Sequence, residues 1–152
     1  KYIDDGGNLE FVFIGGGVFS QKIHELSKKY PQVKYIGKTS SLDASIEMQK
    51  HDWGILPIED EVTKYAYPSK ISSYILNDCK IFAICGNNTN ISRFIKSNHV
   101  GVVSEPEINN IVQSLFKIEQ QKIELNSMTA EYKKEVTVEY FAKQCLISMG
   151  LD

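Results

Sequence analysis

The chain has 152 residues and a formal net charge of −2, enough length for one domain with a substantial core. The slight acidity gives no reason to expect nucleic acid or an anionic membrane as a main partner. No apolar stretch approaches the roughly 18 residues needed to span a bilayer, and no secretory signal peptide is visible at the first residues.

Apolar runs typical of strands alternate along the chain with segments of helical periodicity. The run from Leu9 to Ile14 suits a strand buried on both faces of a parallel sheet, and Gly15 to Gly17 end it. The expected strands are 9–14, 33–36, 53–56, 80–85 and 100–103. The expected helices are about 18–29, 42–50, one that starts at Pro68, one from 91, one from 106 to 116, and one or two around 128–134 and 138–149, capped by Gly150.

This alternation predicts an α/β fold, a Rossmann-like parallel sheet of about five strands with helices on both faces, plus C-terminal helices. We expect residues 1–125 to form the domain and residues 126–152 to form the C-terminal helices. Right-handed crossovers place every strand-to-helix loop at one edge of the sheet, where ligands of open α/β sheets bind. The loop that precedes Pro68 is therefore a candidate ligand site.

Ser69 and Lys70 follow Pro68, a residue that suits the first turn of a helix. Both would lie beside free backbone N–H groups at the positive end of the helix dipole. A lysine there does not compensate the dipole, but it fits a site where an anion such as phosphate binds. The alternative is a solvated surface lysine.

Other motifs are less specific. Gly15 to Gly17 could let the backbone approach a phosphate or sugar, or form a tight turn. The dinucleotide fingerprint is incomplete, because Ser20 stands where its third glycine would fall. The acidic run Glu59 to Glu61 could contact sugar hydroxyls or lie solvated in a loop. Tyr65 and Tyr67 could stack on a base or sugar, or cover that loop.

Cys79, Cys85 and Cys145 lie in apolar surroundings without metal-ligand spacing. We interpret them as reduced thiols in the core of a cytoplasmic protein. The three histidines are scattered, so no zinc site is expected.

Five segments in this order resemble the nucleotide-sugar-binding, C-terminal half of a GT-B-fold glycosyltransferase, of the bacterial group 1 kind, over about residues 9–116. They are Phe-Val-Phe-Ile-Gly-Gly-Gly (11–17), Val-Lys-Tyr-Ile-Gly-Lys (33–38), Asp-Trp-Gly-Ile-Leu-Pro (52–57), the segment 67–82 with Pro-Ser-Lys at 68–70, and 91–103. The resemblance implies an enzyme of bacterial polysaccharide or glycan synthesis that transfers a sugar from a nucleoside-diphosphate donor to an acceptor hydroxyl.

The resemblance also implies roles for particular residues, and it implies no metal and no cofactor, because the nucleotide sugar is the substrate. The donor diphosphate would be bound by Ser69, Lys70, Gly16 and Gly17, the nucleoside by Gly37, Lys38 and Tyr74, and the sugar contacted by Glu59, Asp60 and Tyr67. No residue of this chain is expected to be the catalytic base.

The chain departs from the family at several positions. Tyr74 stands where a ribose-binding glutamate is usual, and Cys79 and Ile81 replace the usual glycine and proline. The family's first strand and helix of this domain and its acceptor-binding N-terminal domain have no match. We therefore expect a fragment that does not catalyse transfer alone, whose C-terminal helices pack on this domain or on the missing N-terminal domain.

The intact protein would lie in the cytoplasm, peripheral to the inner membrane where its acceptor is lipid-linked. Two alternatives stay open: a non-catalytic nucleotide-binding or interaction domain of the same fold, and a nucleotide-sugar epimerase.

Overall fold

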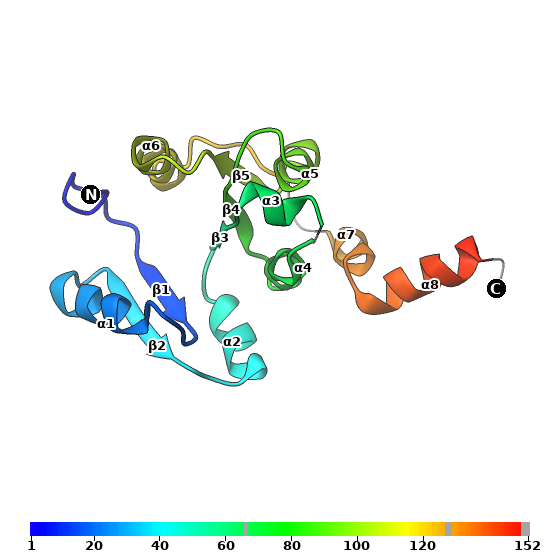
Figure 1. Ribbon diagram of the computed structural model, residues 1–152, viewed down its shortest axis with the longest axis horizontal. Coiled ribbons are helices and arrows are strands. Elements are labelled where there is room, and N and C mark those ends of the chain that lie inside the picture. Colours follow the sequence, from blue (N-terminus) through cyan, green and yellow to red (C-terminus); the bar gives the residue numbers. More distant parts are fainter. Residues whose placement is uncertain (66, 127–128, 150–152) are drawn as a thin grey trace. The chain divides into compact units, whose positions relative to one another are not determined.

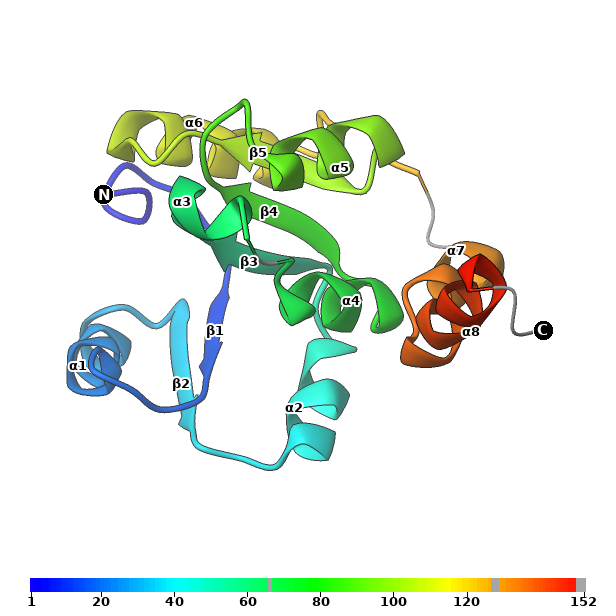
Figure 2. The same cartoon turned by 45° about the vertical axis from the view of Figure 1, so that its right-hand side comes forward.

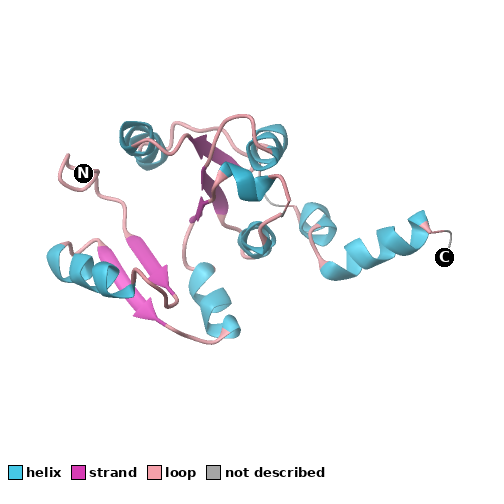
Figure 3. Ribbon diagram, viewed as in Figure 1, coloured by secondary structure: helices cyan, strands magenta, loops and turns pink. Residues whose placement is uncertain are grey.

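The structure is a computed structural model that describes residues 1–65, 67–126 and 129–149 (Figure 1). Strands alternate with helices along the described chain (Figure 3), which confirms the predicted α/β class. The elements are β1 (Phe11–Ile14), α1 (Ser20–Lys29), β2 (Val33–Gly37), α2 (Ser41–Met48), β3 (Trp53–Pro57), α3 (Asp60–Thr63), α4 (Ser69–Leu76), β4 (Lys80–Ile84), α5 (Asn90–Asn98), β5 (Gly101–Ser104), α6 (Ile108–Glu119), α7 (Ala130–Glu135) and α8 (Val138–Ser148).

All strand pairs are parallel, but the five strands form two sheets where we expected one. The first sheet has the order β1-β2, and the second has the order β3-β4-β5. The chain accordingly divides into two compact units. Unit 1 comprises residues 1–47 and 107–123, and unit 2 comprises residues 48–106 and 124–152.

Unit 1 contains the β1-β2 pair, whose register runs from Phe11 opposite Val33 to Ile14 opposite Gly37. Helix α1 packs against β2. The prediction that the first strand is buried on both faces is wrong, because none of the four β1 residues is buried. A two-stranded sheet gives each of its strands only one hydrogen-bonded neighbour, so neither strand lies inside the sheet.

The N-terminal residues of unit 1 contribute to its packing through Tyr2. The Tyr2 ring, 5% exposed, contacts the rings of Phe11 at 5.8 Å and Phe116 at 4.9 Å between centroids. Its hydroxyl donates to Glu119 Oε2 at 2.8 Å and accepts from Leu9 N–H at 3.1 Å. Tyr2 thereby connects the N-terminal residues, β1 and α6.

Unit 2 is built around β4, which lies between β3 and β5 (Figure 2). Its three middle residues, Ile81 to Ala83, are buried, as expected for the central strand of a parallel sheet. Helices α4 and α5 pack on the same face of this sheet (Figure 1), the arrangement that right-handed crossovers between successive neighbouring strands require. The buried core comprises Leu56, Ile71, Ile75, Ile81, Ala83, Cys85, Ile91, Ile95 and Val100.

Helix α7 belongs to the same unit and packs on this core through Tyr132 and Val136. An ion pair of 2.5 Å between Lys133 and Asp78 joins α7 to the turn that follows α4. The predicted helix start at Met128 and the predicted cap Gly150 lie outside the described residues, and the division at residue 125 stays a prediction.

Two local features differ from the expectations. Residues 60–63, expected to be loop, form the single-turn helix α3, whose first turn carries Asp60 and Glu61, acidic residues that suit a helix N-terminus. Pro68 is the N-cap of α4 instead of a first-turn residue, because its ψ of 123° is extended.

The cysteines are all free. Cys79 and Cys85 are buried in unit 2, as predicted, and Cys145 in α8 is half-buried. None of the helices within the described ranges is long and apolar enough to cross a membrane.

Candidate functional site

Within unit 2, the start of α4 is the part of the predicted site that carries a cation. Ser69 and Lys70 are its first two residues, and both side chains are exposed. The N-cap, Pro68, supplies no side-chain acceptor, and its carbonyl oxygen accepts the N–H of Ile71 at 3.0 Å. The Lys70 ammonium has no ion-pair partner among the residues that the structure describes.

Three other helix starts of unit 2, those of α5, α7 and α8, are capped by side chains of the protein itself. In α5, Thr89 Oγ1 accepts the N–H of Ser92 at 3.1 Å. Thr129 and Thr137 cap α7 and α8 in the same manner. The first N–H groups of an uncapped helix stay available to water or a ligand and attract anions. The α4 start therefore combines open N–H groups with an exposed lysine, a pair suited to a phosphate group.

The acidic residues near this start have different surroundings. Glu59 is exposed and is the N-cap of α3, without a side-chain cap bond. Asp60, the next residue, accepts the backbone N–H of Gly86 on its Oδ1 at 2.7 Å. Asp60 is thus tied to the loop between β4 and α5.

Each tyrosine predicted for the site packs against its own unit. Tyr67 lies edge-on to Phe94 with ring centroids 5.5 Å apart. Burial, with a smaller effect of Tyr132, raises the pKa of Tyr67. The Tyr74 hydroxyl donates to the carbonyl oxygen of Ile55 at 2.9 Å, and burial raises its pKa. The Tyr74 proton is therefore already committed, and only its oxygen lone pairs could meet a ribose hydroxyl.

The remaining predicted residues lie in unit 1. Gly15 to Gly17 and Phe13, Ile14, Val18, Phe19, Ser20, Ile23 and Tyr35 line a hollow of about 230 Å³. Lys38 lies over the glycine turn, so a Cβ at Gly16 would be 2.8 Å from Lys38 Cε. Gly17 and Gly37 adopt positive φ angles of 157° and 78°, and the Gly37 value is one that favours glycine.

The structure thus divides the predicted site residues into two groups. Unit 1 brings Gly16, Gly17, Gly37 and Lys38 into one turn region. Unit 2 holds the others on the segment from the N-cap of α3 to the end of α4: Glu59, Asp60, Tyr67, Ser69, Lys70 and Tyr74. The role of each residue stays a prediction.

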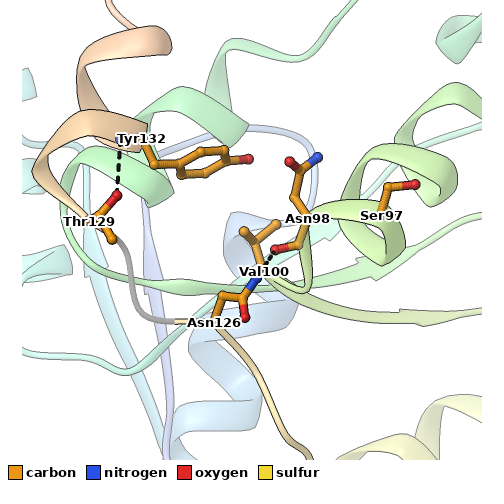
Figure 4. A pocket seen from close by; sticks show the side chains of 6 residues that line it. All are labelled: Ser97, Asn98, Val100, Asn126, Thr129 and Tyr132. Atoms are coloured by element: carbon orange, nitrogen blue, oxygen red, sulfur yellow. Dashed lines mark hydrogen bonds between the residues drawn. The ribbon is translucent and has the colours of Figure 1, made fainter.

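A larger hollow, of about 380 Å³, lies elsewhere in unit 2 (Figure 4). Its described lining residues are all uncharged: Ser97, Asn98, Val100, Asn126, Thr129 and Tyr132. It adjoins the end of α5 and the residue before β5, at the opposite end of the strands from the loops that precede α4 and α5. Without a cation in this lining, the hollow is poorly suited to a diphosphate.

The sequence did not reveal the contact between Asp60 and Gly86, which lie 26 residues apart. A glycine directly after a strand was its only available signal. Among residues 1–65, 67–126 and 129–149, no three His, Cys, Asp or Glu side chains gather where they could hold a metal ion.

Comparison with known proteins gives one family. The family model described as "Glucosyltransferase 3-like, C-terminal domain" matches residues 9–149. No curated protein and no solved structure gave a match.

Proposed function

Because the chain belongs to the Glucosyltransferase 3-like, C-terminal domain family, we propose that it binds a nucleoside-diphosphate sugar for a transferase. The intact protein would pass the sugar to an acceptor hydroxyl, in bacterial polysaccharide or glycan synthesis. The chain would be the donor-binding part, and an N-terminal domain would supply the acceptor site.

The observation that carries this proposal is the start of α4. Pro68 leaves the first N–H groups of the helix without a side-chain cap, and Ser69 and Lys70 are exposed beside them. Lys70 and these N–H groups would bind the donor diphosphate. As the glycosidic bond breaks, negative charge grows on the leaving diphosphate, and fixed donors stabilise that charge more strongly than they stabilise the bound donor.

The predicted site residues of unit 1 would contribute further contacts to the donor. Lys38 and the Gly37 turn are proposed to contact the nucleoside, and the backbone of Gly16 and Gly17 the diphosphate. Support comes from the hollow beside this turn and from the Lys38 side chain that lies over Gly16. Glu59 and Tyr67 of unit 2 are proposed to face the transferred sugar.

A non-catalytic nucleotide-binding domain is the second candidate. Tyr74 favours it, since its hydroxyl is engaged with Ile55 where the related enzymes usually place a carboxylate for the ribose. A domain that binds a nucleotide without its sugar conjugate, within a full-length protein that lacks transferase activity, would support this reading.

Calorimetric titration with UDP, GDP and ADP tests the main proposal. We expect one of them to bind, and Lys70→Ala to weaken binding about tenfold or more, the loss typical of a hydrogen bond to a charged group. Lys64→Ala is the matched control, because it removes the same charge from an exposed lysine that already pairs with Glu61 at 2.6 Å. The proposal fails if none of the three binds, or if the two variants lose affinity equally.

A further inference from the structure

Asp60 makes a specific contact with the loop that follows β4. Its Oδ1 accepts the Gly86 N–H at 2.7 Å, across 26 residues of sequence. The bond joins the first residue of α3 to Gly86, which lies two residues past the end of the central strand β4. A carboxylate that accepts a backbone N–H makes one of the stronger kinds of protein hydrogen bond.

Gly86 is shaped to receive this carboxylate. A Cβ at this position would lie 2.2 Å from Asp60 Oδ2, so a side chain here would push the carboxylate away. Gly86 is not among the glycines with positive φ. The approach of Asp60, and not backbone conformation, is therefore what calls for glycine at this position.

Two further hydrogen bonds tie the same two segments together. The N–H of Ile58 donates to the carbonyl oxygen of Ile84 at 3.1 Å, and Asn90 Nδ2 donates to the carbonyl oxygen of Thr63 at 3.5 Å. The segment from the end of β3 through α3 is thus held along the β4–α5 loop. Asp60 supplies the only charged group in these three bonds.

The held segment leads into the α4 start. Only residues 64–68 separate the end of α3 from Ser69, so the position of α3 restricts where the first turn of α4 and Lys70 can lie. We propose that Asp60 is a positioning residue, which orders the loops beside the α4 start through Gly86 and thereby supports diphosphate binding. This inference rests on the proposed function and gives Asp60 a role that needs no contact with the sugar.

The test uses Asp60→Ala, which removes the acceptor, and Asp60→Asn, which keeps an oxygen able to accept the Gly86 N–H. NMR measures the rate of hydrogen exchange at the Gly86 amide. This rate should increase in Asp60→Ala, whereas the amide should stay protected in Asp60→Asn. Calorimetry then compares UDP, GDP and ADP with their glucose conjugates. Asp60→Ala should weaken the nucleotide that binds and its glucose conjugate by the same factor, about threefold to thirtyfold, and Asp60→Asn should restore both.

A double-mutant cycle checks that the effect passes through Gly86. Gly86→Ala alone should weaken binding as Asp60→Ala does, because its Cβ displaces the carboxylate. Added to Asp60→Ala, the same substitution should have no further effect, because the carboxylate is gone. Additive losses would overturn the proposal.

The other outcomes are also decisive. A loss confined to the glucose conjugate would show that Asp60 contacts the sugar directly, and unchanged affinity in Asp60→Ala would show that it has no role in binding. Both results overturn this inference and leave the donor-site proposal standing. If no nucleotide binds the unaltered chain, the donor-site proposal itself fails and this inference fails with it.

Discussion

The Tyr74 ring occupies the space that a side chain at Gly54 would need. A Cβ at Gly54, in β3, would lie 2.3 Å from Tyr74 Cδ1. The hydroxyl of the same ring donates to the carbonyl oxygen of Ile55 at 2.9 Å. Helix α4 thus packs on β3 through the Tyr74 ring, which lies against the backbone of Gly54, and through the hydrogen bond from Tyr74 to Ile55. These two contacts hold in place the helix that begins with Ser69 and Lys70.

Three glycine-to-alanine substitutions should therefore differ in cost. Gly54→Ala should lower the free energy of unfolding by about 1–3 kcal/mol, the usual cost of overpacking, because the Tyr74 ring is confined. Gly101→Ala should cost more, since its Cβ would lie 1.9 Å from the backbone oxygen of Ile81 in the neighbouring strand. Gly16→Ala should cost least, because its Cβ meets the flexible end of Lys38. Urea denaturation measures the free energy of unfolding of all three variants. An equal loss in each would show that the mobility of the neighbouring atoms does not determine the cost.

Removal of a tyrosine hydroxyl should affect stability differently at two positions of unit 2. The Tyr132 hydroxyl is buried and has no hydrogen-bond partner among the described residues, so Tyr132→Phe should leave stability unchanged or raise it by up to about 1 kcal/mol. Tyr74→Phe makes the same chemical change but breaks the bond to Ile55, and should cost about 1 kcal/mol. Urea denaturation of both variants gives the comparison, and a larger loss for Tyr132→Phe would refute it.

Tyr2 should make the stability of the chain sensitive to alkaline pH. Burial raises its pKa from 10.0 to about 12, opposed by the hydrogen bond from Leu9 and reinforced by Glu119. Below the ordinary pKa the phenol is neutral in both states and its contribution is complete. Above the ordinary pKa, Tyr2 loses its proton in the unfolded chain but keeps it in the folded chain, which favours unfolding. The contribution of Tyr2 to stability is therefore lost as the pH rises through the folded pKa.

Tyr2→Phe isolates this effect from the other tyrosines and cysteines. At about pH 8 the variant should be less stable than the unaltered chain, because Glu119 Oε2 and the Leu9 N–H lose the Tyr2 hydroxyl as a partner. At about pH 11 the difference in unfolding free energy should be smaller, since phenylalanine has no proton to lose. Urea denaturation at both values measures the difference, and one that stays constant or grows would count against the raised pKa.

The packing of Tyr2 and the helix α3 were both missed by sequence reasoning, for related physical reasons. Residues 1–8 are mostly polar, and nothing near Tyr2 in the sequence announces Phe116 and Glu119, more than a hundred residues away. Helix α3 is one turn long, too short for apolar periodicity to repeat. Its acidic residues looked like a solvated loop, although acidic side chains also favour the start of a helix.

The order and type of the main elements, the α/β class and the parallel pairing could all be predicted from the residue pattern. Hydrophobic periodicity, glycine turns and helix caps depend on residues a few positions apart, and a regular alternation of strands with helices favours parallel pairing through crossovers. The Pro-Ser-Lys start of α4 was visible for the same reason, within one residue.

The division of the strands between two sheets, and the hydrogen bonds that already engage particular polar groups, could not be predicted from that pattern and are seen in the folded chain. The bonds of Asp60 to Gly86 and of Tyr74 to Ile55 join residues 26 and 19 positions apart. Such contacts depend on how side chains pack once the elements are assembled, and that packing cannot be predicted from residues that are close together in the sequence. Lys70 was found from its neighbours in the chain, whereas the role proposed for Asp60 came from its neighbours in space.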